Sequence, residues 1–172
     1  TVTIDRSTIR DAIETNLAQN GFLAEFGDAG GPWAGNSIPY RQDTTKEVDE
    51  LTDYLGTQWL GRGWVNISPA LKDAIVGRVW EIYENAFEHA YSADKENIGI
   101  FCCGQHYPHL HCLKLTVIDF GVGIPSNVRL FRHDNAIGSD TALRWAFQRG
   151  TTTKPNGMGR GLGLDLLKDF VK

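Results

Sequence analysis

The first helix of the chain is predicted by apolar residues that recur every four positions. Ile9, Ile13 and Leu17 have this spacing, which is typical of one side of an amphipathic helix. Asn20-Gly21 follows directly, and these residue types favour the C-terminal cap of a helix. The pattern therefore predicts a short helix from Ser7 to Gln19.

Two longer helices are predicted downstream by the same kind of spacing. The first runs from about Lys46 to Leu60, where Gly61-Arg62-Gly63 ends it, and the second runs from Ser68-Pro69 to about Tyr91. Serine is a favoured N-cap and proline fits the first turn, so Ser68-Pro69 is a good helix start. The expected buried sides consist of Val48, Leu51, Leu55 and Trp59 in the first helix, and of Leu71, Ile75, Val79, Ile82 and Phe87 in the second.

Short β-branched and apolar runs predict three strands. Ile38 to Arg41 suits an edge strand, because Pro39 has no N–H to donate inside a sheet. Residues 98–103 and 113–118 indicate neighbouring strands joined by a turn rich in histidine and proline. After them we expect a short helix from Thr141 to Gln148. A last helix is expected with an inner side made of Leu164, Leu167 and Val171.

Composition and charge exclude several classes of protein. The chain has 172 residues, 41% of them hydrophobic and 22% charged, which suits one globular domain with a sizeable core. Its net charge of −4 gives no overall basic character of the kind that direct nucleic-acid binding usually requires. The sequence contains neither an apolar run long enough for a membrane span nor a signal-peptide pattern at its start. We therefore expect a soluble, cytoplasmic protein without a membrane segment.

A cluster of cysteine and histidine residues raises the question of a zinc site. The cluster comprises Cys102, Cys103, His106, His109, His111 and Cys112. Its spacing matches none of the usual structural zinc motifs, and the residues flank two predicted strands. Reduced thiols in a hairpin that packs partly in the core are the favoured interpretation.

The helix predicted after Ser68 has a polar side where a core-facing side would be apolar. Glu81, Asn85 and His89 are spaced by four, so all three project from one side of the helix. An amide oxygen and a carboxylate one turn apart can hold Mg²⁺ and orient a water molecule beside it. The alternative interpretation is a solvated helix surface, on which Glu84 and Glu88 are further charges.

A second candidate site begins at Asp119, directly after the last predicted strand. Its carboxylate can accept a hydrogen bond from an adenine amino group. Gly121 and Gly123 lack the Cβ that would block a base lying on the backbone. A tight turn after a strand is the alternative explanation of the same residues.

A third candidate site is a run of glycines that leads into the last predicted helix. Closely spaced glycines at a helix start present backbone N–H groups and the positive end of the helix dipole to a phosphate. Lys154 and Arg160 could add local positive charge. A flexible hinge is the alternative. The stretch comprises Gly157, Gly159, Arg160, Gly161, Leu162 and Gly163.

Taken in order, these stretches resemble the motifs of the GHKL superfamily, the ATPases shared by DNA gyrase B, heat-shock chaperones, sensor histidine kinases and mismatch-repair proteins. Residues 81–86 resemble its N-box, residues 119–123 its first glycine box and residues 159–164 its second. The chain is most similar to histidine-kinase-like and anti-sigma-factor-kinase-like ATP-binding domains. The resemblance implies an α+β fold, a two-layer α/β sandwich in which helices back a mixed sheet.

The resemblance also implies the roles of the site residues. Asn85 matches the magnesium ligand, Asp119 the adenine reader and Glu81 the carboxylate that activates water, with ATP and Mg²⁺ as cofactors. The similarity covers about residues 68–172, so residues 1–67 are expected to be an extension that packs on this core. The family's strands after the last helix are missing, and the chain stops without a helix cap, so we expect a fragment of a longer protein.

Three functions remain open from the sequence. The first is binding and hydrolysis of Mg-ATP, with closure of a lid from about Ile124 to Asn156 that signals to a partner domain or protein. The second is a protein kinase of the histidine-kinase or anti-sigma-factor type, which passes the γ-phosphate to a protein side chain. The third is a non-catalytic, ATP-gated interaction module.

Overall fold

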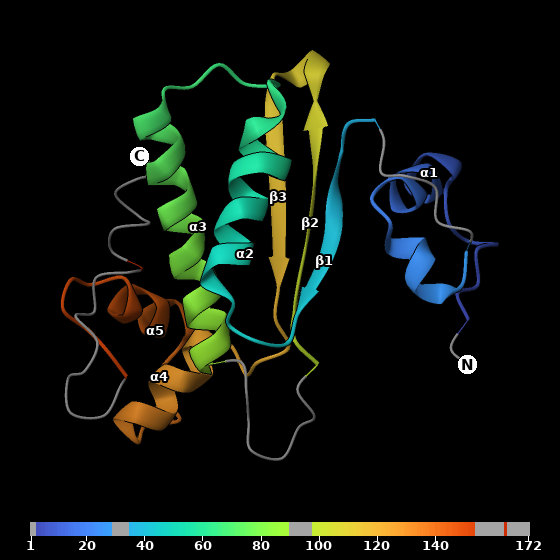
Figure 1. The fold of residues 1–172 in the computed structure, drawn as a ribbon. Helices are drawn as coiled ribbons and strands as arrows, with labels where there is room; N and C mark the ends of the chain where they lie inside the picture. Colours follow the sequence, from blue (N-terminus) through green and yellow to red (C-terminus); the bar gives the residue numbers. More distant parts are fainter. Residues whose placement is uncertain (1–2, 29–34, 90–97, 154–163, 165–172) are drawn as a thin grey trace. The chain divides into compact units, whose positions relative to one another are not determined.

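The computed structural model describes residues 3–28, 35–89, 98–153 and 164 and contains a three-stranded sheet in the order β1-β2-β3 (Figure 1). The strands are β1 (Ser37–Asp43), β2 (Ile100–Tyr107) and β3 (Cys112–Ile118). β2 and β3 pair antiparallel, with Phe101 opposite Ile118 and Tyr107 opposite Cys112. The α+β class expected from the sequence is therefore confirmed.

The predicted strand positions are confirmed with small shifts. β1 lies at one edge of the sheet, as its proline indicated, and a single 3-10 turn, η4 (Pro108–Leu110), joins β2 to β3. His111 closes this turn with a φ of 46°, a left-handed conformation that few residues with a side chain adopt. The hairpin is therefore tighter than the predicted strand ends suggested, because β2 continues to Tyr107.

The described residues divide into two compact units, and the chain passes from one to the other several times. One contains Thr1–Asp43, Glu47–Ser68 and Phe101–Ile118, and the other contains Thr44–Lys46, Pro69–Ile100 and Asp119–Lys172. The sheet belongs almost entirely to the first unit, whereas the longest helix belongs to the second.

The N-terminal helix α1 (Asp11–Gln19) of the first unit is attached through polar contacts. It starts four residues later than predicted, because a turn closed by the Ile9 N–H and the Arg6 carbonyl precedes it. The predicted apolar side is wrong, since no α1 residue is buried and Ile13 is 46% exposed. The Asn16 amide instead donates to the Ser37 hydroxyl at 2.8 Å, which ties α1 to β1.

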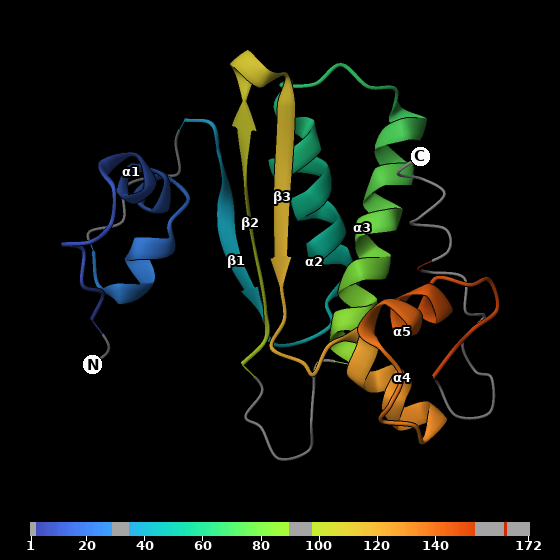
Figure 2. The same ribbon diagram turned by 180° about the vertical axis from the view of Figure 1, so that it is seen from behind.

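The second predicted helix is a composite of three helix types. It runs through α2 (Val48–Asp53), a π-helical turn η2 (Tyr54–Trp59) and a 3-10 turn η3 (Leu60–Arg62), which a left-handed Gly63 ends. Figures 1 and 2 show α2 over one face of the sheet and α1 beside β1. Burial of Leu51, Leu55 and Trp59 is confirmed, whereas Val48 is 45% exposed because it belongs to the exposed first turn of α2.

Tyr54 fastens this composite helix to the sheet. Its hydroxyl donates to the Pro39 carbonyl at 2.7 Å, and its ring lies 5.0 Å from the Arg41 guanidinium carbon. Arg41 is itself paired with the buried Asp43. Burial is the main cause that raises the pKa of the Tyr54 phenol, so the hydroxyl stays protonated and continues to donate.

We expect Tyr54→Phe to lower the free energy of unfolding by about 1 kcal/mol, because the Pro39 carbonyl loses its donor while the ring contacts remain. Urea unfolding followed by circular dichroism measures this change. Tyr107→Phe is the matched control, since the Tyr107 hydroxyl donates to none of the described residues. Equal stability of the two variants would contradict the anchoring role of Tyr54.

Helix α3 (Pro69–His89) is the longest helix of the second unit, and its predicted start at Ser68-Pro69 is confirmed. Its buried positions are Val79, Tyr83 and Ala86. The predicted apolar side is therefore only partly right, because Leu71 is 42% exposed and the fully buried Tyr83 was not expected on that side. The buried side follows steps of four and three residues from Val79, as helical geometry requires.

The region between 124 and 150 is a pair of helices where the sequence indicated a lid with one helix. α5 (Ser139–Ala146) corresponds to the predicted helix, whereas α4 (Ile124–Arg132) was not predicted. The Arg129 guanidinium joins the two helices, donating to the Ile137 carbonyl at 2.7 Å and to the Ser139 hydroxyl at 2.9 Å. Pro125 in the first turn was the signal that could have located α4.

The end of the chain lies mostly outside the described residues. Leu164 is helical, which agrees with a last helix at that position, but its neighbours are not described. Among the described residues, no helix combines the length and the apolar character that a membrane crossing requires.

Candidate functional site

Glu81 and Asn85 lie one turn apart in the second half of α3, and both side chains are half-buried. Side chains four residues apart on a helix have Cβ atoms about 6 Å apart, so one ligand can contact both. In the described part of the chain, no hydrogen bond or ion pair engages the Glu81 carboxylate or the Asn85 amide. A cation or a water molecule can therefore contact their oxygens without displacing a described residue.

The neighbouring carboxylate, Glu84, is engaged in contrast. Its Oε1 lies 2.6 Å from Lys46 Nζ, and that ammonium lies 5.3 Å from the centre of the Trp80 ring. The side chains of Lys46 and Glu84 are 37% and 33% exposed, so solvent weakens this pair. The contact still distinguishes the two acids, since Glu84 has a structural partner and Glu81 has none among the described residues.

Asp119 stands directly after β3, at the strand end where the sequence predicted it. Its Oδ1 accepts a hydrogen bond from the Gly121 N–H at 2.8 Å. The tight turn weighed as an alternative is therefore present, but it uses only one of the two carboxylate oxygens. The side chain is exposed, and within the described ranges nothing bonds to Oδ2. A carboxylate held in this way can accept from a ligand amino group without giving up its turn.

Gly123 fixes the direction in which the chain leaves this turn. Its φ of 80° is a conformation that side chains disfavour, and its carbonyl accepts the first hydrogen bond of α4 from the Asn127 N–H. Pro125 follows in the first turn of that helix. The glycine is therefore needed to connect the Asp119 turn to α4.

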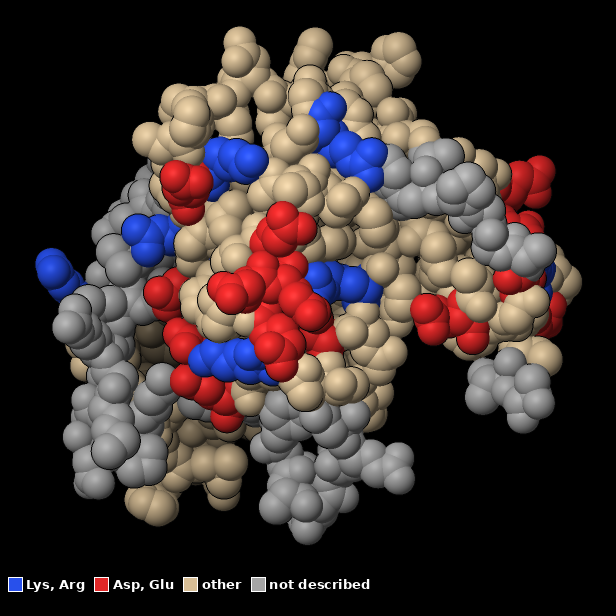
Figure 3. Space-filling model, viewed as in Figure 1, with Lys and Arg blue, Asp and Glu red and all other residues tan. Residues whose placement is uncertain are grey.

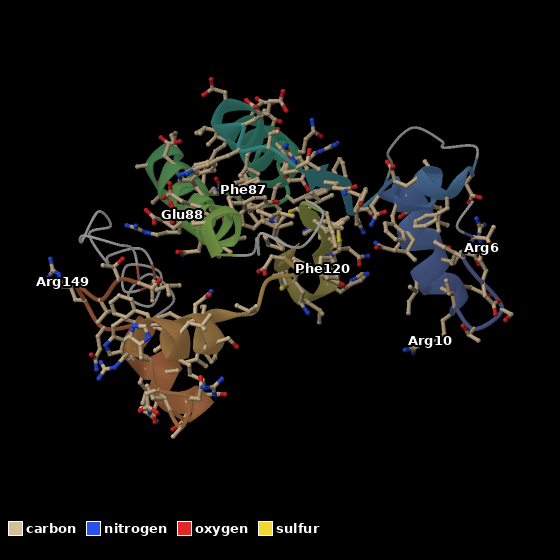
Figure 4. The ribbon with its side chains drawn as sticks, turned by 90° about the horizontal axis from the view of Figure 1, so that it is seen from below. Arg6, Arg10, Phe87, Glu88, Phe120 and Arg149 are labelled. Carbon is tan, nitrogen blue, oxygen red and sulfur yellow. The ribbon has the colours of Figure 1, made fainter. Side chains whose placement is uncertain are left out.

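Two apolar side chains beside Asp119 were missed by the sequence analysis. Phe120 is 54% exposed and Val122 is 50% exposed, and Figure 4 labels Phe120 on the segment that follows β3. An exposed apolar surface next to a carboxylate acceptor suits a flat base with an amino group. The signal for them is the alternation of glycine with large apolar residues after Asp119.

The second unit contains Glu81, Asn85, Asp119, Gly121 and Gly123. Figure 4 labels Phe87 and Glu88 near the end of α3, the helix that also contains Glu81 and Asn85. His89 is the last residue of α3, and its side chain is outside the described part. The remaining predicted site residues also lie outside it, namely Lys154, Gly157, Gly159, Arg160, Gly161, Leu162 and Gly163.

The cysteine and histidine cluster forms a packed hairpin. Cys102 is buried, Cys103 and Cys112 are half-buried, and all three are free thiols. Burial raises the pKa of the Cys103 thiol, which makes it less reactive. The His106 ring stacks on Trp64 with centroids 5.0 Å apart. No group of three metal-ligating side chains occurs among the residues with described positions.

Because comparison with known proteins gives no match, the contacts of Glu81, Asn85 and Asp119 are the basis for assigning a function. No protein-family model, curated protein or solved structure matches the chain.

Proposed function

We propose that this chain is an ATP-binding domain of the GHKL type, a two-layer α/β sandwich that binds Mg-ATP and hydrolyses it. One observation carries the proposal: the Asp119 carboxylate is fixed by its own turn through Oδ1 and keeps Oδ2 open among described residues. The proposal gains support from Glu81 and Asn85, two side chains of the same compact unit whose oxygens bond to no described residue.

Each residue then has a chemical role that fits its surroundings. Asp119 accepts from the adenine amino group, and the exposed Phe120 and Val122 contact the apolar faces of the base. Asn85 ligates Mg²⁺ through its amide oxygen, since this ion prefers oxygen ligands. Bound Mg²⁺ supplies positive charge that offsets the phosphates. The N–H groups of residues 157–163 are proposed to hold those phosphates.

Hydrolysis is favoured over the other uses of the same site by the state of Glu81. A general base needs a carboxylate that is free to accept a proton from water, and an ion pair would occupy it. Glu84, three residues further along α3, has such a pair with Lys46, whereas Glu81 has none with a described residue. We therefore assign the polarisation of the attacking water to Glu81.

Comparison of Glu81→Gln with Glu84→Gln tests this assignment. Glutamine keeps the size of the side chain but cannot take a proton, so we expect Glu81→Gln to lower ATP turnover about 100-fold or more. ATP affinity should change little, since the base does not hold the nucleotide. Glu84→Gln removes the charge that faces Lys46 and should leave turnover close to that of the parent protein.

Phosphate release and calorimetric ATP binding together separate the possible outcomes. Loss of turnover with retained binding supports hydrolysis by Glu81. Label transferred from γ-labelled ATP to a protein side chain would instead identify a kinase. Binding without turnover in the parent protein would identify an ATP-gated interaction module, and no binding at all would overturn the proposed function.

A further inference from the structure

The helical hairpin α4–α5 presents large apolar and cationic side chains to solvent. Leu130 is 65% exposed and Leu143 is 36% exposed. Between residues 124 and 150 the sequence has four arginines and two aspartates, in a chain whose net charge is −4. We call Leu130, Leu143, Arg144 and Arg149 the hairpin surface.

The arginines of the hairpin surface make no hydrogen bond or ion pair with a described residue that would explain their presence. Arg129 joins α4 to α5, but the Arg144 and Arg149 guanidinium groups bond to no residue within the described ranges. Figure 4 shows Arg149 extending away from the chain. Exposed leucines and exposed arginines in one helical hairpin are typical of a surface that binds an acidic, partly apolar partner.

The first unit has a surface of the complementary kind on α2. Asp49, Glu50 and Asp53 are exposed, and helical geometry places Asp49 and Asp53 opposite the buried Leu51. No basic residue occurs between 47 and 53, and Val48 adds an exposed apolar side chain beside the acids. Figure 3 shows acidic side chains gathered over α2. We call Asp49, Glu50 and Asp53 the acidic face.

We propose that the hairpin surface of one copy of this chain binds the acidic face of a second copy. Opposite charges on the two surfaces speed encounter and fix the register, while contact of Leu130 and Leu143 with Val48 removes exposed apolar area from water. The contact joins two different surfaces, so it is heterologous. It does not depend on nucleotide and is independent of the proposed function.

Charge reversal of each surface tests the contact with the intact protein. Arg144→Glu/Arg149→Glu makes the hairpin surface acidic, and Asp49→Lys/Asp53→Lys makes the acidic face basic. Light scattering coupled to gel filtration, at about 20 mM salt where charges are weakly screened, should give a mass above one copy for the parent protein. We expect one-copy masses for each variant alone and recovery of the larger mass when the two variants are mixed.

The mixed sample is the decisive measurement, because each variant alone brings like charges together whereas the mixture restores opposite ones. Arg10→Glu/Lys114→Glu controls for net charge, since like the hairpin variant it replaces two cations by two acids, and it should still associate. Circular dichroism confirms that every variant is folded. A one-copy mass for the parent protein, undiminished association of either variant, or failure of the mixture to recover would overturn the proposal.

Discussion

Asp119→Asn should weaken ATP binding about 10-fold or more while leaving the fold intact. The asparagine side-chain oxygen can still accept from the Gly121 N–H, so the turn after β3 is kept. The position of Oδ2 becomes an amide NH₂, however, and a donor then faces the adenine amino group. Loss of a hydrogen bond to a charged group costs about 1.5–3 kcal/mol, which corresponds to about 10- to 150-fold in affinity.

Asp134→Asn is the matched control for this measurement. Asp134 makes the same kind of turn in the same unit, since its Oδ1 accepts from the Ala136 N–H at 2.9 Å. Its substitution should leave ATP affinity unchanged in isothermal calorimetry. If Asp119→Asn binds ATP as tightly as the parent protein, adenine is not read by this carboxylate, and the assignment fails.

Gly104→Ala should lower the free energy of unfolding by about 3 kcal/mol, in the upper range for an added methyl group in a packed interior. A Cβ at Gly104 would overlap the Lys114 carbonyl of the neighbouring strand and lie 2.6 Å from Ile38 Cδ1. Neither a backbone carbonyl nor the fully buried Ile38 can move aside cheaply. The substitution therefore presses β1, β2 and β3 apart at one point.

Gly77→Ala provides the opposite expectation from the same chemical change. Gly77 lies inside α3, and a Cβ added there meets no atom within 4 Å. Alanine should therefore raise the free energy of unfolding by about 0.5–1 kcal/mol through its better helix propensity. Denaturant unfolding of both variants measures the contrast. Equal effects on stability would show that Gly104 is not tightly enclosed.

The sequence predicted the elements that local residue types mark. The start of α3, the edge position of β1 and the β2–β3 hairpin are confirmed because proline, serine and β-branched residues mark them locally. α1 and η2 differ from expectation for two physical reasons. α1 is held by polar bonds such as that of Asn16, which leave no apolar signature, and the spacing that predicts an ordinary helix does not signal a rare π-helical turn within it.

The positions of the candidate site residues in the fold were predictable, and their contacts were less so. Asp119 at the end of β3 and the shared helix side of Glu81 and Asn85 follow from local spacing. The ion pair of Glu84 joins residues 38 positions apart, and no local pattern signals such a contact. The exposed Phe120 also depends on tertiary packing, since exposure is set by what the remainder of the chain covers.

The chain changes from one compact unit to the other after Asp43, Lys46, Ser68, Ile100 and Ile118. Neither unit is therefore a continuous stretch of sequence, and no single proteolytic cut can release one of them. The polar residues of α3 and the Asp119 turn are likewise separated in sequence by two strands of the sheet. A ligand that binds only the folded chain raises its free energy of unfolding, so we expect ligand binding and unfolding to be thermodynamically linked.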